Sequence, residues 1–130
     1  MADRHLVSSG SPFEPTIGFS RAVRVGDRVI VSGTGPVVSR GTCPEDAAGQ
    51  ARRCFEIIEA ALEEAGASLR DVVRTRMYIT AAEYAGAVGE VHGDLMGSVR
   101  PAATMVVVAE LLHPAWKVEI EAEAVVPDRA

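Results

Sequence analysis

Apolar residues recur along this chain at two different spacings, one typical of strands and the other typical of helices. A spacing of two positions, together with short runs of β-branched residues, predicts strands at 22–25, 28–32, 72–79, 104–111 and 117–126. Spacings of three and four positions predict two amphipathic helices, at 44–65 and 80–96. The predicted order is β-β-α-β-α-β-β, an α+β domain with two helices on one face of a sheet.

Residues with special backbone preferences mark the ends of these elements. Gly26-Asp27 predicts a two-residue hairpin turn between the first two strands. Pro44 suits the first turn of a helix and Gly66 suits its C-terminal end. Thr80-Ala81-Ala82-Glu83 matches a capping box that would open the second helix. Residues 1–20 are rich in glycine, proline and serine, which predicts a loop-like entry.

Two predicted strands carry polar residues at alternate positions and therefore on one face each. The last strand carries three glutamates there and the third strand two arginines and a tyrosine: Glu119, Glu121, Glu123, Arg74, Arg76 and Tyr78. If the two rows meet, they form either a solvated lattice of ion pairs or a cleft flanked by one carboxylate and one guanidinium. Charged strand faces are more often simply solvated, so the lattice is the favoured interpretation for any single residue.

One predicted strand lacks this polar alternation. Met105-Val106-Val107-Val108 is apolar on both faces, which predicts that both faces are covered. Since helices are expected on one side of the sheet only, the second cover would come from another subunit. The pattern therefore favours an oligomer.

Composition narrows the class of protein. Hydrophobic residues make up 48% of the chain, enough to build a core and to exclude disorder. No run of about 18 apolar residues exists, which argues against a membrane span. The net charge of −5, without a Lys/Arg cluster, argues against a nucleic-acid partner. We expect one cytoplasmic domain covering residues 1–130, with Cys43 and Cys54 as reduced thiols.

Motifs for metal, nucleotide or nucleophile chemistry are weak in this sequence. His5, His92 and His113 lack the spacing of metal ligands, so no metal site is expected. Gly33-Thr34-Gly35 is only half of a dinucleotide fingerprint, and no helix follows it directly. Cys43 precedes a helix, but no basic residue is predictably near it, so a capping or loop role is favoured.

Several stretches, in order and across almost the whole chain, resemble the RidA/YjgF family of reactive enamine/imine deaminases. They are Ile17-Gly18-Phe19-Ser20, Ala22-Val23, Gly26-Asp27, Val31-Ser32-Gly33, Gln50, Ala65-Gly66, Asp71-Val72-Val73-Arg74-Thr75, Arg100-Pro101-Ala102 and Val118-Glu119-Ile120-Glu121-Ala122. The resemblance implies a homotrimer that binds a small metabolite in clefts between subunits and uses no cofactor. It also implies that Glu119 is the catalytic general base, which positions the water that attacks an imine carbon, and that Ser32 borders the cleft.

Three positions depart from the family pattern. The family's arginine after Pro-Ala, which holds a substrate carboxylate by a bidentate contact, is Ala103 here. Phe19 stands near the place of a tyrosine, and Thr34 replaces a glutamine after Ser-Gly. Arg76, with Arg100 as the alternative, is the candidate for a substitute cation. The ligand-binding residues expected on this basis are Phe19, Ser32, Thr34, Arg76 and Ala103.

The resemblance implies hydrolytic deamination of an enamine or imine as the inherited function. Because the family's arginine is absent, this activity is either retained in an altered form or lost. The first alternative is a non-catalytic trimeric ligand-binding or regulatory module, in which Glu119 is structural. An RNA endonuclease is a further alternative, which the acidic net charge opposes. A chorismate mutase-like isomerase is the last alternative and rests on the similarity of architecture alone.

Overall fold

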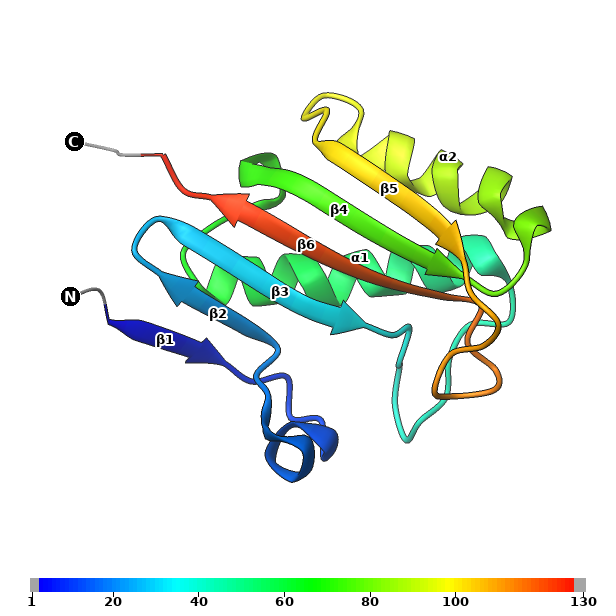
Figure 1. Ribbon diagram of the computed structural model, residues 1–130, viewed down its shortest axis with the longest axis horizontal. Helices are drawn as coiled ribbons and strands as arrows, with labels where there is room; N and C mark the ends of the chain where they lie inside the picture. The colour runs from blue at the N-terminus through cyan, green and yellow to red at the C-terminus, as the bar shows by residue number, and fades with distance from the viewer. Residues whose placement is uncertain (1–2, 128–130) are drawn as a thin grey trace.

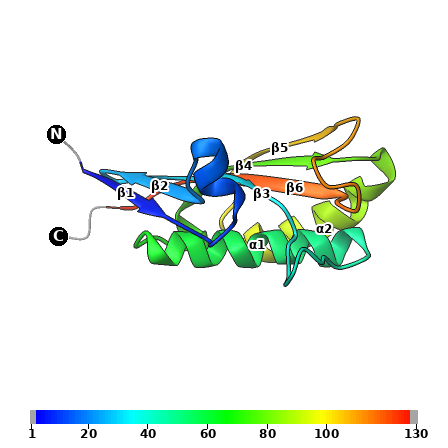
Figure 2. The ribbon, with the colours of Figure 1, turned by 90° about the horizontal axis from the view of Figure 1, so that it is seen from below.

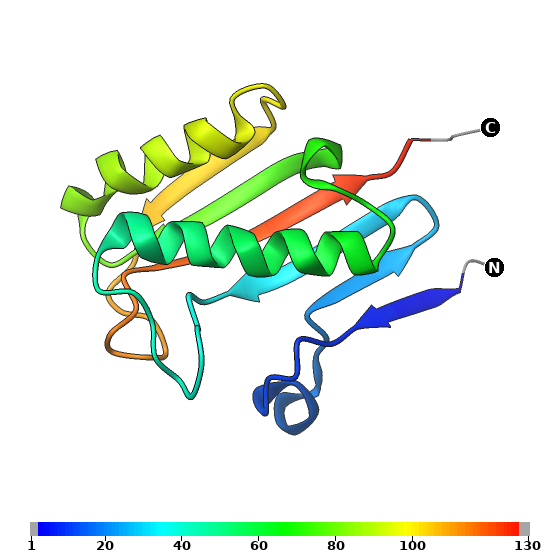
Figure 3. The ribbon, with the colours of Figure 1, turned by 180° about the vertical axis from the view of Figure 1, so that it is seen from behind.

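One six-stranded sheet runs through the molecule in the order β1-β2-β3-β6-β4-β5 (Figure 1). The computed structural model describes residues 3–127. The strands are β1 (Arg4–Val7), β2 (Ala22–Val25), β3 (Arg28–Thr34), β4 (Val72–Ile79), β5 (Ala102–Val107) and β6 (Val118–Val125). The helices are α1 (Ala47–Glu64) and α2 (Ala85–Met96), with short helical turns η1 (Glu14–Gly18), η2 (Leu69–Asp71) and η3 (Ala82–Tyr84). Both long helices cover the same side of the sheet (Figures 2 and 3). The predicted α+β class and the predicted order of these elements are confirmed.

The sheet contains one strand more than the sequence predicts. Residues 4–7, expected to be part of a loop, form β1 and pair antiparallel with β2. Only Val7 of this strand is buried, and Leu6 is 57% exposed, so the segment carries no clear alternation. Its strand conformation comes from hydrogen bonding to the free edge of β2 rather than from its own apolar pattern.

The chain order does not match the spatial order of the strands, and the sheet is mixed. The last strand, β6, lies between β3 and β4 and pairs antiparallel with both. The β4–α2–β5 segment returns to the sheet in the same direction, so β4 and β5 are parallel. The β4–β5 pair makes the sheet mixed, because the other strand pairs are antiparallel.

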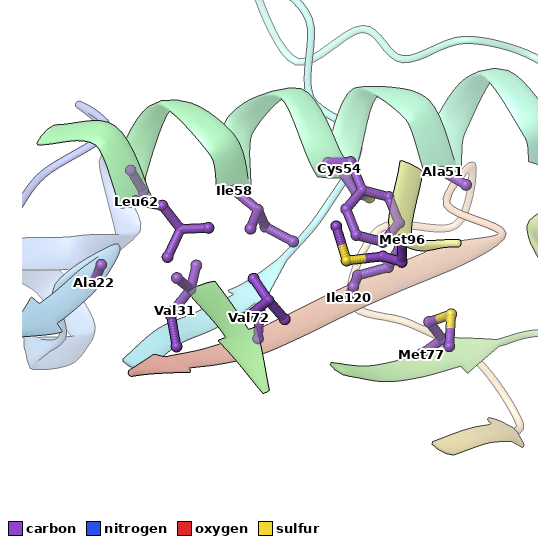
Figure 4. Close-up of a cluster of buried hydrophobic side chains, with 14 of the residues drawn as sticks. Ala22, Val31, Ala51, Cys54, Ile58, Leu62, Val72, Met77, Met96 and Ile120 are labelled. Carbon is purple, nitrogen blue, oxygen red and sulfur yellow. The ribbon is translucent and has the colours of Figure 1, made fainter. Parts of the chain in front are cut away.

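A continuous core lies between the sheet and the two helices (Figure 4). The predicted inner face of α1 is confirmed, because every residue assigned to it is buried: Ala47, Ala51, Cys54, Ile58, Leu62 and Ala65. These side chains meet the alternate residues of the strands that face the helices, including Val31, Val72 and Ile120. Burial of this apolar surface, at about 25 cal/mol per Å², is the main force that holds helices and sheet together.

Both helices begin differently from the sequence prediction. Helix α1 starts at Ala47, and the Asp46 side chain accepts a hydrogen bond from the Gly49 N–H, so Pro44 lies outside the helix. The predicted capping box does not form, because the residues from Ala82 to Tyr84 make a 3₁₀ turn before α2 begins. Aspartate is a favourable N-cap residue, but the sequence prediction took Pro44, two residues earlier, as the start of the helix.

A bulge in β4 changes which side of the sheet one residue faces. The pairing with β6 skips between Val72 and Arg74, so Val72 is buried while Val73 is 46% exposed. The sequence pattern placed Val73 on the buried side with Thr75, which is wrong. A bulge inserts one residue into a strand and reverses the alternation locally, and nothing in the local sequence marks this insertion.

The apolar strand β5 is not covered on both faces within one chain. It forms an edge of the sheet, and Val106 and Val107 are 41% and 56% exposed. The predicted second cover was assigned to another subunit, so it stays a prediction. The exposed valines remain the observation that favours a second subunit.

Glycines inside α2 lower the stability of this helix relative to alanine, which gives a first testable prediction. A Cβ added at Gly93 would meet no atom within 4 Å. We expect Gly93→Ala to raise the free energy of unfolding by about 0.5–1 kcal/mol, because alanine loses less backbone entropy on folding. Urea denaturation at pH 7 measures the change.

The matched control is Gly26→Ala in the β2–β3 turn. A Cβ there would also meet open space, but Gly26 has a φ of 62°, which alanine rarely adopts. This variant should lose stability. A loss at Gly93 similar to that at Gly26 would contradict the prediction.

Candidate functional site

The side of the sheet away from the helices carries the two polar rows predicted from the sequence. In the β4–β6 ladder, Tyr78 lies opposite Glu119, Arg76 opposite Glu121, and Arg74 opposite Glu123. Paired residues of an antiparallel ladder point to the same side of the sheet. The two rows therefore do share a face, as the alternation suggested.

The middle of this face is an ion-pair network centred on Glu121. Arg76 Nη1 lies 3.4 Å from Glu121 Oε1, and the Tyr78 hydroxyl donates a 2.7 Å hydrogen bond to the same oxygen. That hydrogen bond, aided by burial, raises the pKa of Tyr78. Since the Arg76 and Glu121 side chains are 38% and 29% exposed, their pairing stabilises the fold little. Arg76 is thus occupied by Glu121 and makes no ion pair with Glu119 among the described residues.

Glu119 differs from the other two glutamates because its carboxylate lies against the backbone of β3. A Cβ added at Gly33 would clash with Glu119 Oε2, so the glycine supplies the space that this carboxylate occupies. Burial raises the pKa of Glu119; the charge of Arg21 opposes that rise and the charge of Glu121 adds to it. A half-buried carboxylate with a raised pKa is a suitable proton acceptor near neutral pH.

Arg21, which the sequence analysis did not select, is the cation whose positive charge lowers the pKa of Glu119. Its side chain is 9% exposed, and its Nη1 donates to the Gly33 carbonyl at 2.7 Å and to Thr34 Oγ1 at 3.1 Å. One signal could have identified it. The hairpin register places Arg21 opposite Ser32, at the point where β3 approaches the predicted site.

Three of the predicted ligand-binding residues gather around Arg21. The Phe19 ring lies under its guanidinium, with Cζ 5.4 Å from the ring centroid. The Ser32 hydroxyl donates to the Ser20 carbonyl at 2.6 Å. The buried Thr34 hydroxyl donates to the Ser32 carbonyl at 2.8 Å while it accepts from Arg21. The hydroxyl protons of Ser32 and Thr34 are thus engaged by backbone carbonyls of the same chain.

Ala103 lies away from this group in the single chain. It pairs with Thr75 in the β4–β5 ladder, and Thr104 is the residue that pairs with Arg76. Ala103 therefore faces the side of the sheet opposite to Glu119, on the edge strand, where it is exposed. One copy of the chain does not bring positions 103 and 119 together.

His92 lies apart from this group, on the helix side of the sheet, and no metal cluster is found among the described residues. Residues 3–127 contain no group of three or more His, Cys, Asp or Glu side chains that could hold a metal ion. His92 contacts Thr75 Oγ1 at 2.9 Å and packs edge-on against Phe55. Burial lowers its pKa. None of the helices in this part of the chain is long and apolar enough to cross a membrane.

Comparisons with known proteins find relatives that match most of this chain. The family model described as Endoribonuclease L-PSP matches residues 10–126. The uncharacterized protein SCO2049 of Streptomyces coelicolor is 39% identical over 119 residues, which cover 91% of this chain and 89% of that protein. The 2-iminobutanoate/2-iminopropanoate deaminase of Escherichia coli K12 is 32% identical over 111 residues, which cover 82% of this chain and 86% of the enzyme.

Solved structures extend the likeness to the whole fold. Rv2704 of Mycobacterium tuberculosis, a member of the YjgF/YER057c/UK114 family, has a TM-score of 0.89 and 48% identity and covers 95% of this chain and 100% of its own. The YjgF gene product of E. coli has a TM-score of 0.78 and 29% identity, with 92% of each chain covered. The fold of this chain is therefore similar to that of solved members of a known family. The chain belongs to the RidA/YjgF family.

Proposed function

We propose that this protein hydrolyses a small enamine or imine to a carbonyl compound and ammonia, with Glu119 as the general base. The observation that carries the proposal is the half-buried Glu119 carboxylate, which lies against Gly33 and has a raised pKa. The deaminase name of the E. coli relative supports the same reaction class. The reaction needs no cofactor, because water is the only co-reactant.

Each step of this reaction requires a proton transfer that one carboxylate can supply. Glu119 accepts a proton from a water as its oxygen attacks the imine carbon, and the C=N bond becomes a C–N bond. The protonated Glu119 returns that proton to the nitrogen, which gives a carbinolamine. Glu119 then accepts the hydroxyl proton and passes it to the nitrogen, so the C–N bond breaks and ammonia leaves as the C=O bond forms. Phe19, Ser32 and Thr34, which gather around Arg21, would lie near this carbon.

A homotrimer is part of the proposal. The exposed Val106 and Val107 on the edge strand β5 are apolar surface that another copy would cover. The same contact would bring Ala103 of one copy towards a neighbour, which gives this edge residue a place in a cleft between subunits. With alanine at position 103 and Arg76 engaged by Glu121, the cleft offers an anionic substrate less charge pairing than an arginine at 103 would.

The test is ammonia release from imines generated in the assay, with and without a carboxylate next to the imine carbon. We expect the protein to release ammonia faster than spontaneous hydrolysis does. Light scattering should give a molar mass of about three chains. A non-catalytic ligand-binding module is the second candidate, and the alanine at 103 favours it. Ligand-dependent thermal stabilisation without acceleration of any imine would establish the module and overturn the enzyme.

A further inference from the structure

A buried arginine lies just before β2, at the edge of the group formed by Glu119 and Gly33. Arg21 is 8% exposed, and its Nε lies 3.4 Å from Ser9 Oγ and 3.9 Å from Glu14 Oε2. Glu14, itself 5% exposed, is held by a 2.5 Å hydrogen bond from the Ser9 hydroxyl. Burying a cation is costly unless it is hydrogen-bonded, and here Nε and Nη1 have acceptors on the same chain.

Arg21 Nη1, at the other end of the guanidinium, binds β3, the strand against which the Glu119 carboxylate lies. Arg21 Nη1 donates to the Gly33 carbonyl at 2.7 Å, and the same glycine leaves the space that the Glu119 carboxylate fills. The cation and the carboxylate are therefore joined through one residue of β3. The turn η1, which supplies Glu14, rises on the side of the sheet away from the helices (Figure 2).

The charged and titratable groups around Glu119 come from several elements. Glu121 follows it on β6, Tyr78 lies opposite on β4, and Cys54 on α1 interacts with its charge. Arg76 is paired with Glu121. Arg21 is thus the cation whose charge acts on Glu119 among the described residues, and Glu14 is the anion that partly offsets it.

We propose that Arg21 is a positioning residue for Glu119: it fixes the Gly33 segment against which the carboxylate lies and places a permanent positive charge beside it. This inference rests on the proposed function for the role of Glu119 as a base. It adds that the cation of this site is a structural group of the same chain, held through Nε and Nη1 by Ser9, Gly33 and Thr34.

The test measures the titration of Glu119 directly, without a substrate. Protein labelled with ¹³C at the glutamate side-chain carboxyl is titrated by NMR, and Glu119→Gln identifies the signal. We expect Arg21→Gln to shift the titration upward by about one pH unit or more, since an opposite charge nearby favours the ionised form. Arg21→Lys, which keeps the charge, should recover most of that shift.

Two further variants keep the test decisive if Arg21→Gln does not fold. Glu14→Gln removes a negative charge beside Arg21 and should move the Glu119 titration in the opposite direction, downward. Arg24→Gln is the matched control, because Arg24 also donates to a backbone carbonyl, that of Ala65 at 2.7 Å, at the other end of β2. It should leave the titration unchanged.

The outcomes separate this inference from the proposed function. An unchanged Glu119 titration in both Arg21→Gln and Glu14→Gln, or an equal shift in Arg24→Gln, overturns the role of Arg21 even if the protein releases ammonia. The expected shifts in a protein that accelerates no imine would support the Arg21–Glu119 coupling and refute the deaminase. In an active protein, the acid limb of the kcat/KM profile should move with the same sign in Arg21→Gln.

Discussion

Replacing Glu119 with glutamine is expected to reduce imine hydrolysis by about 10²–10⁴-fold, the usual contribution of a positioned general base. Glutamine has nearly the same shape but cannot accept the proton of the attacking water. Initial rates of ammonia release, corrected for spontaneous hydrolysis, measure the loss. In the wild-type protein the rate should also fall as the pH drops through the raised pKa of Glu119.

The same substitution should not weaken the fold. Because burial raises the folded-state pKa of Glu119 above its usual 4.5, folding favours the protonated form, and this contribution is lost as the pH rises through that pKa. A neutral glutamine has no such loss. Glu119→Gln should therefore match or exceed the wild-type melting temperature at pH 7, and the difference should vanish below the usual carboxyl pKa.

The matched control for this experiment is Glu123→Gln. Glu123 lies on the same face of β6, opposite Arg74 and four residues further along the strand. Since Glu123 has no part in the proposed chemistry, its loss should leave the rate within about twofold of wild type, as for most surface substitutions. Equal losses at both positions would show that the charge of the row matters and that no single glutamate acts as the base.

Replacing Gly33 with alanine is the second large expected effect. The added Cβ would occupy the position of Glu119 Oε2, which must move aside. Since the displaced atom is the end of a flexible side chain, stability should change little, whereas a displacement of about 1 Å at the base can lower the rate about 10²-fold. Steady-state kinetics and thermal unfolding of the same variant measure the two effects.

A double substitution tests the cause of that loss. Aspartate at position 119 is one methylene shorter and leaves room for the new Cβ, so Gly33→Ala should lower the rate far less in a Glu119→Asp background. Such non-additivity is the mark of two residues in contact. If the two losses simply add, the Gly33–Glu119 contact does not determine the position of the base.

Several features of the fold could be predicted from local sequence because they depend on the direction of side chains along one element. The apolar face of α1 follows from spacings of three and four, and the glutamate row of β6 follows from strict alternation. Gly26-Asp27 identified the hairpin turn, since a left-handed residue is needed there. The candidate base, Glu119, was reached through family resemblance carried by residues of the same strand.

The features that failed or were missed depend on which segments meet. Strand β1 forms because β2 offers a free edge, and the bulge at Val73 exists only in the pairing with β6. Ala103 faces away from Glu119 because β5 runs parallel to β4 in a particular register. None of these partners is encoded in the spacing of residues within one strand.

By itself, the sequence determined the element types, the buried helix face and the two polar rows, because each arises from the geometry of a single helix or strand. Only the tertiary structure decided that Arg76 is paired with Glu121 and that Arg21 is joined to Glu119 through Gly33. The reason is physical. The protonation state and the position of a side chain in a site depend on neighbours that are distant in sequence. Here those neighbours follow from the place of β6 between β3 and β4.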